Sequence, residues 1–392
     1  MKLPLPRFGT TVSLGKRKFC FSRVPRAEIL IISSDTATEL AAHFPQRHVY
    51  VLDIESRTYF VRALISCFLR GNFNFPGYIA TVINQSGADL AISLQDNLLA
   101  LFKVKPMLRR ARIALVQNGQ RAVRGDLEGE LAERASRSLS VDYYFTFNEA
   151  YAERMQTLAN ANVVVIGSFR SNSTDKAAAK KHGISLISTY NPEVPHSKVL
   201  TETSSNESIT YQMILDARLA VVRAVADFCA TNRIDFSICG KRSNEQALAE
   251  ERYYRSVLPE TDFIYHSRTS YGTNYQTCDS SSIVVSTGST LGYESLGRGN
   301  RTAFFRPDFH MLHDESLRFG WPLDIPEEGP FWSTSSSPRR VFEVLTFLSD
   351  VSEPDWAQSL AQFKSVIPAL DEGNSVLVRT LSEFGAHSIR TH

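Results

Sequence analysis

The segment Ile283–Gly299, IVVSTGSTLGYESLGRG, predicts a buried strand, a loop of hydroxyl groups and glycine, and then a short helix. Its first three residues are β-branched, as is typical of a strand buried on both faces of a parallel sheet. Ser289 is suited to cap a helix over Thr290–Arg298, and Gly299 suits a left-handed stop. Because the first N–H groups of a helix favour an anion, we expect a phosphate at this loop. The expected phosphate ligands are Ser286, Thr287, Gly288, Ser289 and Thr290.

Glu294 follows one turn after Thr290, so both side chains are expected on one face of the helix. The Thr290 hydroxyl would then contact the phosphate, and the Glu294 carboxylate would contact the ribose hydroxyls. The alternative is an exposed glutamate that is only favoured by the helix dipole. The loop matches neither the phosphate-binding loop of NTPases nor the Gly-x-Gly-x-x-Gly motif, so we do not expect cleavage of a γ-phosphate.

The composition predicts a globular protein of two domains, because 392 residues exceed one ordinary core. A net charge of +2 gives no reason to expect a nucleic-acid partner. The five cysteines are scattered without a Cys-x-x-Cys pair, which predicts reduced thiols, a cytoplasmic location and no zinc site. We expect no signal peptide, no membrane span and no metal, because the histidines lack ligand spacing and no Asp-x-Asp occurs.

Strand-like and helical segments alternate along the chain, which predicts an α/β fold of GT-B type: two Rossmann-like domains with a cleft between them. We predict an N-terminal domain over residues 1–200, a C-terminal domain over 201–372, and a helix within 373–392 that packs back on the first domain. Strands are expected in the first half at 28–33, 49–53, 90–94, 113–117, 143–147, 163–166 and 185–188. Ligands of such folds bind outside the carboxyl ends of the strands.

Cations follow two predicted strands of the second half. Lys241 and Arg242 come after the strand 236–239, and Arg268 follows the strand 263–266. They could balance a phosphate or a sugar carboxylate, although solvated surface charge is the alternative. His266 is interpreted either as a general acid or phosphate donor, or as a structural histidine.

Carboxylates and carboxamides follow the strands of the first half. Asp96 is the preferred catalytic carboxylate, and its alternative role is to cap a helix that begins near Leu98. Glu149 is a second catalytic candidate, with stabilisation by a helix dipole as the alternative. The expected acceptor-binding or sugar-binding residues are Asn97, Gln117, Asn118, Arg121, Ser168 and Arg170.

These segments together resemble glycosyltransferases of the GT-B type. The loop 286–299 is similar to the donor loop of bacterial surface-carbohydrate biosynthesis proteins, and so are the elements at 96–97, 117–121, 167–168 and 329–332. Within that group the chain resembles the retaining β-Kdo transferase domain of O-antigen assembly. The resemblance covers residues 28–370.

The resemblance implies a donor, CMP-Kdo, and an acceptor hydroxyl on a glycan of lipopolysaccharide or on a lipid-linked glycan. The loop 286–290 would bind the CMP phosphate, and Glu294 its ribose. A retaining enzyme of this kind implies a carboxylate nucleophile, for which Asp96 is preferred over Asp235. A cation such as Arg121, Lys241 or Arg268 would suit the carboxylate of Kdo. No separate cofactor or metal is expected.

Three alternatives stay open. The donor could be another CMP- or CDP-linked group, such as a nonulosonic acid or an alditol phosphate. The chain could be an enzyme like the UDP-sugar 2-epimerases, or a module that binds a nucleotide sugar without reaction.

The basic segment Lys103–Arg112 suggests a peripheral contact with the inner membrane. The alternative is that this segment is a solvated face.

Overall fold

The computed structural model describes residues 11–14, 17–33, 36–120, 139–176, 181–202, 207–311, 318–321, 323 and 325–382. The chain forms two compact units. The first unit consists of Met1–Gly119, Gly125–Phe169 and Asn374–His392, and the second of Gln120–Arg124 and Arg170–Gly373. Neither unit is therefore one continuous segment of the sequence.

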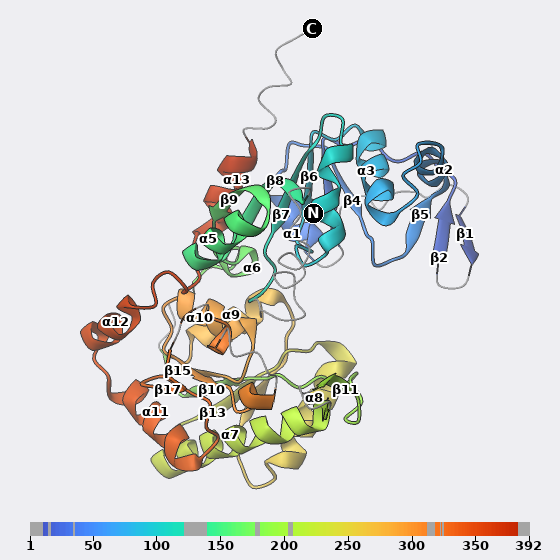
Figure 1. Cartoon of the computed structure of the whole chain (residues 1–392). Helices are drawn as coiled ribbons and strands as arrows, with labels where there is room; N and C mark the ends of the chain where they lie inside the picture. Colours follow the sequence, from blue (N-terminus) through green and yellow to red (C-terminus); the bar gives the residue numbers. More distant parts are fainter. Residues whose placement is uncertain are drawn as a thin grey trace. The chain divides into compact units, whose positions relative to one another are not determined.

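The first unit is built on a six-stranded parallel sheet in the order β4-β3-β6-β7-β8-β9 (Figure 1). Its strands are β3 (Ile29–Ile32), β4 (Val49–Leu52), β6 (Leu90–Ser93), β7 (Arg112–Val116), β8 (Ser140–Thr146) and β9 (Asn160–Val165). The strand order reverses direction between β3 and β6, which makes this point the topological switch of the sheet.

Both faces of this sheet are buried, and the alternation of side chains along each strand divides them between two cores. Leu30 and Ile32 join one core, which also holds residues of α2 (Val61–Leu69) and α3 (Phe75–Ser86). Ile29 and Ile31 join the other, with α1 (Ala37–Ala42) and α13 (Ser375–Ser382). Apolar runs on consecutive residues are therefore explained by two-sided burial.

The rest of the first unit includes a small sheet in the order β1-β2-β5. The additional elements are β1 (Thr11–Leu14), β2 (Arg17–Cys20), β5 (Thr58–Phe60), the 3₁₀ turns η1 (Leu99–Lys103) and η2 (Lys105–Met107), and α5 (Glu149–Leu158). The helix expected to begin near Leu98 is a 3₁₀ turn, and Pro106, three residues after its end and within η2, disfavours a longer helix. Residues 128–137, for which the sequence pattern predicts a helix, lie outside the described residues.

The second unit contains a seven-stranded sheet in the order β14-β13-β10-β15-β16-β18-β17. Its strands are β10 (Ile184–Ile187), β13 (Phe236–Cys239), β14 (Ile264–His266), β15 (Ile283–Ser286), β16 (Thr302–Phe305), β17 (Glu328–Gly329) and β18 (Trp332–Ser333). All neighbours pair in parallel except β17 with β18. The predicted α/β class with parallel sheets is confirmed.

The strand near 185–188 was assigned to the N-terminal domain, and this assignment was wrong. In the structure β10 lies between β13 and β15, and it pairs in parallel with both. The order of the parallel strands in this sheet reverses between β10 and β15, so the topological switch lies beside the loop after β15.

Helices surround this second sheet and are joined to it by short connections. They are α6 (Phe169–Asn172), which begins at the last residue of the first unit, α7 (Tyr211–Asn232), α8 (Asn244–Val257), α9 (Tyr271–Asp279), α10 (Thr290–Gly297), α11 (Pro338–Asp350) and α12 (Glu353–Ala361). The hairpin β11 (Val199–Glu202) and β12 (Ser208–Thr210) precedes α7, and the 3₁₀ turns are η3 (Phe309–Met311), η4 (Arg318–Gly320) and η5 (Glu372–Asn374). Among the described residues, no helix has both the length and the apolar character to cross a bilayer.

A buried ion pair connects the end of α10 to α9. Arg298 and Asp279 are each about 1% exposed, and the guanidinium Nε donates to Asp279 Oδ1 at 3.0 Å. Arg298 Nη1 also donates to the carbonyl oxygens of Ser171 and Thr174 at 2.8 and 3.0 Å. Because each donor finds an acceptor, the charge is stable without water.

The substitution Asp279→Asn should lower the free energy of unfolding of the second unit by about 3–5 kcal/mol, since it leaves a buried arginine without its counter-charge. Urea unfolding followed by circular dichroism measures this loss. Glu251→Gln is the matched control, because Glu251 pairs with Arg255 on the surface of α8, and it should cost about 0.5 kcal/mol or less. Equal effects of the two substitutions would contradict the structural role given to Asp279.

Candidate functional site

The loop after β15 lies at the topological switch of the second sheet, as the strand order requires. Thr287 Oγ1 lies 3.4 Å from Thr189 Oγ1, in the loop that follows β10. Ser286 and Thr287 are buried, whereas Gly288 is exposed and has a φ of +112°. A side chain at position 288 would be strained, so glycine permits this turn.

The start of α10 differs in detail from the expectation. Ser289 is the N-cap residue, but its side chain makes no capping hydrogen bond. Instead its N–H donates to Ser286 Oγ at 3.3 Å, and a Cβ at Gly292 would collide with the Ser286 side chain. The Ser286 hydroxyl therefore holds the turn against the helix. In the first turn of α10 the N–H of Gly292 donates to the Ser289 carbonyl at 3.0 Å, whereas those of Thr290 and Leu291 have no acceptor within the helix, as at any helix start.

Two arginines that were not singled out from the sequence lie beside Gly288. A Cβ placed on Gly288 would be 3.3 Å from Arg218 Nη2 and 3.4 Å from Arg306 Nε. Arg218 comes from the middle of α7, and Arg306 follows β16 directly. The exposed glycine turn is thus bordered by two guanidinium groups, a recurrent arrangement for binding phosphate.

Asp308 holds both arginines in place. Its carboxylate accepts from Arg218 Nε at 3.2 Å through Oδ2 and from Arg306 Nε at 3.3 Å through Oδ1, and it has no exposed area. Burial alone would raise the pKa of Asp308, but the charges of Arg306 and Arg218 outweigh it and lower that pKa. The triad keeps a net charge of +1, so it can still attract an anion.

The turn after β13 carries two of the predicted cations and is held by a buried carboxylate on α8. Glu250 has no exposed area and accepts from the N–H groups of Lys241 and Arg242 at 3.1 and 2.9 Å. It also accepts from the Tyr265 hydroxyl at 2.8 Å and from Ser188 Oγ. One side chain therefore fixes the carboxyl ends of β10 and β13 and connects to β14.

Lys241, in the turn after β13, interacts electrostatically with its neighbour Arg242 and with Arg218. The pKa of Lys241 is lowered by burial and then by neighbouring positive charges, that of Arg242 first. Arg218 and Arg268 contribute to the same lowering of the Lys241 pKa. Mutual repulsion of this kind is relieved when an anion binds. The predicted Lys241, Arg242 and Arg268 thus belong to one positive region with Arg218.

His266 ends β14 and is half-buried. Burial, with a smaller effect of His182, lowers the pKa of His266 below 6.5. The ring is therefore neutral at pH 7, which favours hydrogen bonding by a neutral imidazole over the action of a protonated general acid.

The two expected ligand groups of α10 are partly engaged with protein. Thr290 Oγ1 accepts from the N–H of Gln120 at 3.2 Å, and Gln120 belongs to the second unit. Glu294 is 7% exposed, so it is not the exposed glutamate of the alternative interpretation. Its proposed contact with ribose stays a prediction.

The catalytic candidate of the first unit, Asp96, is fully buried. Its carboxylate accepts from the Tyr144 hydroxyl at 2.7 Å and from the N–H of Asn118 at 3.1 Å. Gln117 is 2% exposed and accepts from Thr146 Oγ1 at 2.7 Å and from the N–H of Phe147 at 2.9 Å. Both side chains hold the loops at the carboxyl edge of the first sheet. The role of Asp96 as nucleophile stays a prediction.

The other predicted residues of the first half are placed as follows. Asn97 and Glu149 are exposed, and Glu149 lies in the first turn of α5, where the helix dipole favours it. Asn118 and Arg170 are half-buried, and Ser168 is buried at 3% exposure. Arg121 lies outside the described residues. The structure does not test their proposed contacts with sugar or acceptor.

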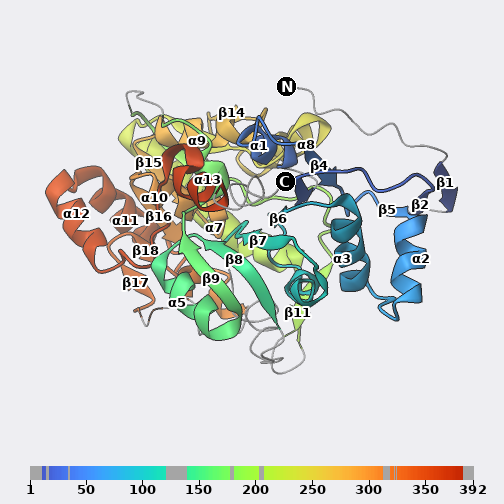
Figure 2. The same cartoon turned by 90° about the horizontal axis from the view of Figure 1, so that it is seen from above.

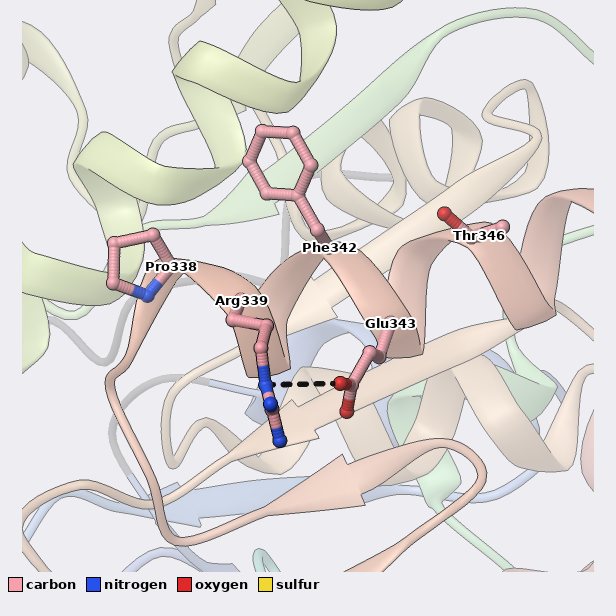
Figure 3. A pocket seen from close by; sticks show the side chains of 5 residues that line it. All are labelled: Pro338, Arg339, Phe342, Glu343 and Thr346. Atoms are coloured by element: carbon pink, nitrogen blue, oxygen red, sulfur yellow. Dashed lines mark ion pairs between the residues drawn. The ribbon is translucent and has the colours of Figure 1, made fainter.

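Two hollows lined by described residues lie away from this positive region. One open depression of about 660 Å³ runs along α11 (Figure 3) and is lined by Pro338, Phe342, Thr346 and the ion pair of Arg339 with Glu343. Its floor is largely apolar, and it lacks convergent polar groups. Within the described ranges, no three His, Cys, Asp or Glu side chains group closely enough to hold a metal ion. The expected independence of metal stays a prediction.

The architecture is that of the GT-B class, with two Rossmann-like units. The structure is similar to the wall teichoic acid polymerase TagF soaked with CDPG, with a TM-score of 0.54 and 11% identity over 93% of this chain and 90% of that chain. It is also similar to a "putative UDP-N-acetylglucosamine 2-epimerase" from Listeria monocytogenes, with a TM-score of 0.54 and 10% identity over 95% and 98% of the two chains. At these identities the likeness shows the shared fold alone.

A family model described as "putative O-antigen biosynthesis protein" matches residues 114–384. The match spans more than half of the sequence, and the chain belongs to this family. No curated protein sequence matches it.

The Asp308 cluster predicts a pH dependence of stability. Because the folded-state pKa of Asp308 is lowered from 3.8, its contribution is fully present above about pH 4 and is lost as the pH falls through the folded-state pKa. The Asp308→Asn variant lacks this contribution, so the difference in melting temperature between wild type and variant should shrink toward acid pH. Thermal unfolding from neutral to acid pH measures it. A difference that grows on acidification would contradict the assignment.

Proposed function

We propose that this protein is a glycosyltransferase of bacterial surface-polysaccharide assembly that uses a nucleotide-linked donor. The observation that carries the proposal is the grouping of Arg218 and Arg306 beside the exposed Gly288 turn, at the switch point of a parallel sheet. Membership of an O-antigen biosynthesis family supports the pathway, and the GT-B type of fold is compatible with the reaction.

Such a site suits the departure of a nucleotide. When the bond from the anomeric carbon to the phosphate oxygen breaks, negative charge develops on that oxygen. Fixed cations and helix N–H groups stabilise this charge because they need no reorganisation. In this proposal Arg218, Arg306 and the first turn of α10 receive the phosphate. In the same proposal the cations Lys241, Arg242 and Arg268 neutralise a second anionic group.

A donor with two anionic groups fits this distribution of charge. CMP-Kdo carries a phosphate and the carboxylate of the sugar, and we propose it as the donor in agreement with the resemblance of the donor loop. A CDP-linked donor carries two phosphates and satisfies the same condition, so it is the second candidate. The acceptor in either case would be a hydroxyl of a glycan, on lipopolysaccharide or a lipid carrier.

Retention of configuration would require two displacements at the anomeric carbon. A carboxylate first attacks that carbon while CMP leaves, and the acceptor oxygen then displaces the carboxylate and loses its proton to a base. Asp96 is the proposed nucleophile. Its burial and its bond to Tyr144 mean that this role requires the carboxylate to become accessible when substrate binds.

Nucleotide binding tests the donor site directly. CMP and CDP should raise the melting temperature of the wild-type protein more than UDP or GDP. Arg306→Met should weaken binding of the preferred nucleotide about tenfold to a hundredfold, as expected for the loss of a charge-assisted hydrogen bond. Titration calorimetry measures this change. Arg339→Met on α11 is the matched control, because Arg339 is 90% exposed, and it should leave the affinity unchanged. Undiminished binding by Arg306→Met would place the phosphate elsewhere.

Release of CMP from CMP-Kdo tests the catalytic carboxylate. If Asp96 is the nucleophile, Asp96→Asn abolishes this release and leaves CMP binding intact, whereas Tyr144→Phe keeps the carboxylate and retains turnover. If the folded Asp96→Asn protein releases CMP at a near-wild-type rate, Asp96 is not the nucleophile and serves only to hold its loop. A wild-type protein that binds CMP but never releases it from the sugar would be a binding module instead.

A further inference from the structure

The first unit presents apolar side chains to solvent on one side of α2 and on the loop that follows it. Ile65, Phe68 and Leu69 are 55%, 66% and 77% exposed, and Phe73 is 66% exposed. We refer to these four residues as the α2 patch. Its helical members are spaced by three and four residues, so they share one face, while Ala63 and Cys67 face the core. Large apolar side chains grouped in this way indicate an interaction surface.

The surroundings of the α2 patch are mostly positive, although the turn that carries Arg57 also holds the exposed carboxylate of Glu55. Residues 17–27 and 56–88 include seven Lys and Arg and no Asp or Glu. Arg62 on α2 and Arg70 at its C-terminal end flank the patch and are exposed. Arg17 and Lys18 on the neighbouring strand β2 and Arg57 in the turn before β5 are exposed as well. None of these five cations forms an ion pair with another described residue. Their charge is therefore available to an external anionic surface.

A hollow of about 440 Å³ opens beside the α2 patch, between β2, β5, α2 and α3. Most of its lining is aromatic, including Phe19, Tyr59, Phe73 and Tyr78, and Arg17 is its charged member. Figure 2 shows α2 beside β1, β2 and β5, with α3 next to it. An apolar hollow that carries a cation has the chemistry of a site for a lipid chain below an anionic headgroup.

We propose that the α2 patch docks this protein on an anionic lipid bilayer. Phe68, Leu69 and Phe73 enter the boundary between headgroups and acyl chains, while Arg62 and Arg70 bind the anionic headgroups. Apolar side chains flanked by cations that form no ion pair with another described residue are complementary to such a membrane in both hydrophobicity and charge.

The basic segment 103–112, from which a membrane contact was inferred in the sequence, is less suited to this role. Lys105 and Arg112 lie 3.2 Å from Asp142, and Arg110 lies 2.6 Å from Asp89. These cations are already neutralised by carboxylates of the same unit, and few large apolar side chains accompany them on the surface. The α2 patch has both exposed apolar side chains and neighbouring cations that no carboxylate of the described residues neutralises.

Sedimentation with lipid vesicles tests the proposal on the full chain. Wild-type protein should bind vesicles rich in phosphatidylglycerol, bind phosphatidylcholine vesicles much more weakly, and dissociate at high salt. The triple variant Phe68→Ser, Leu69→Ser, Phe73→Ser should lose binding at least about tenfold. Arg62→Gln with Arg70→Gln should lose about fivefold for each arginine on the anionic vesicles alone.

The control variant Leu248→Ser, Ile264→Ser removes apolar side chains of similar exposure, 55% and 60%, from the second unit. It should bind vesicles as the wild type does. All variants should keep the wild-type melting temperature and nucleotide affinity, which separates failure of this proposal from failure of the donor site. Unchanged binding by the triple variant, or equal binding to neutral vesicles, overturns the proposal. So does a wild-type dimer that binds no vesicles and is dissociated by the triple substitution, because the patch would then join two copies of the chain.

Discussion

The proposed donor site of the second unit depends on one buried carboxylate between two arginines. Without Asp308, the guanidinium groups of Arg218 and Arg306 would repel one another next to Gly288 and would lose the carboxylate that orients them. With it, the two cations are oriented, and the cluster retains a single positive charge. An anion that arrives at the exposed turn meets donors already in place, so little conformational entropy is lost on binding. Glu250 acts in a similar way on the neighbouring turn, where it fixes backbone N–H groups rather than cations.

Local patterns in the sequence were sufficient for most strands and helices, and for the position of the loop after β15. They succeeded because β-branched runs, glycine and helix caps act within a few residues. They could not identify Arg218 or Asp308, because these lie in a mid-helix position and a loop that meet only through the tertiary fold. The same limitation placed β10 in the wrong sheet. Its sequence predicts a buried strand, but no local sequence pattern indicates that its neighbours are β13 and β15.

Polar residues after strands were predicted at the correct positions in the chain, but the directions of their side chains were not predictable. Gln117 comes directly after β7 and Asp96 three residues after β6, yet both turn inward and accept hydrogen bonds from backbone N–H groups of neighbouring loops. A loop at the edge of a parallel sheet has many buried N–H groups to satisfy, and nearby carboxylates and carboxamides do so. Residues that support a site and residues that contact its ligand therefore share one sequence signature.

The division of the chain between its two units has a consequence for its synthesis on the ribosome. Leu377 and Leu381 of α13 belong to a core of the first unit, together with Ile29 and Ile31. That core stays incomplete until α13 has been made, which happens only after the strands of the second unit have been synthesised. A fragment that begins at residue 201 would also lack β10 and leave β13 and β15 without the strand that joins them. Protein engineers who wish to exchange one unit between relatives must therefore transfer at least two separate segments.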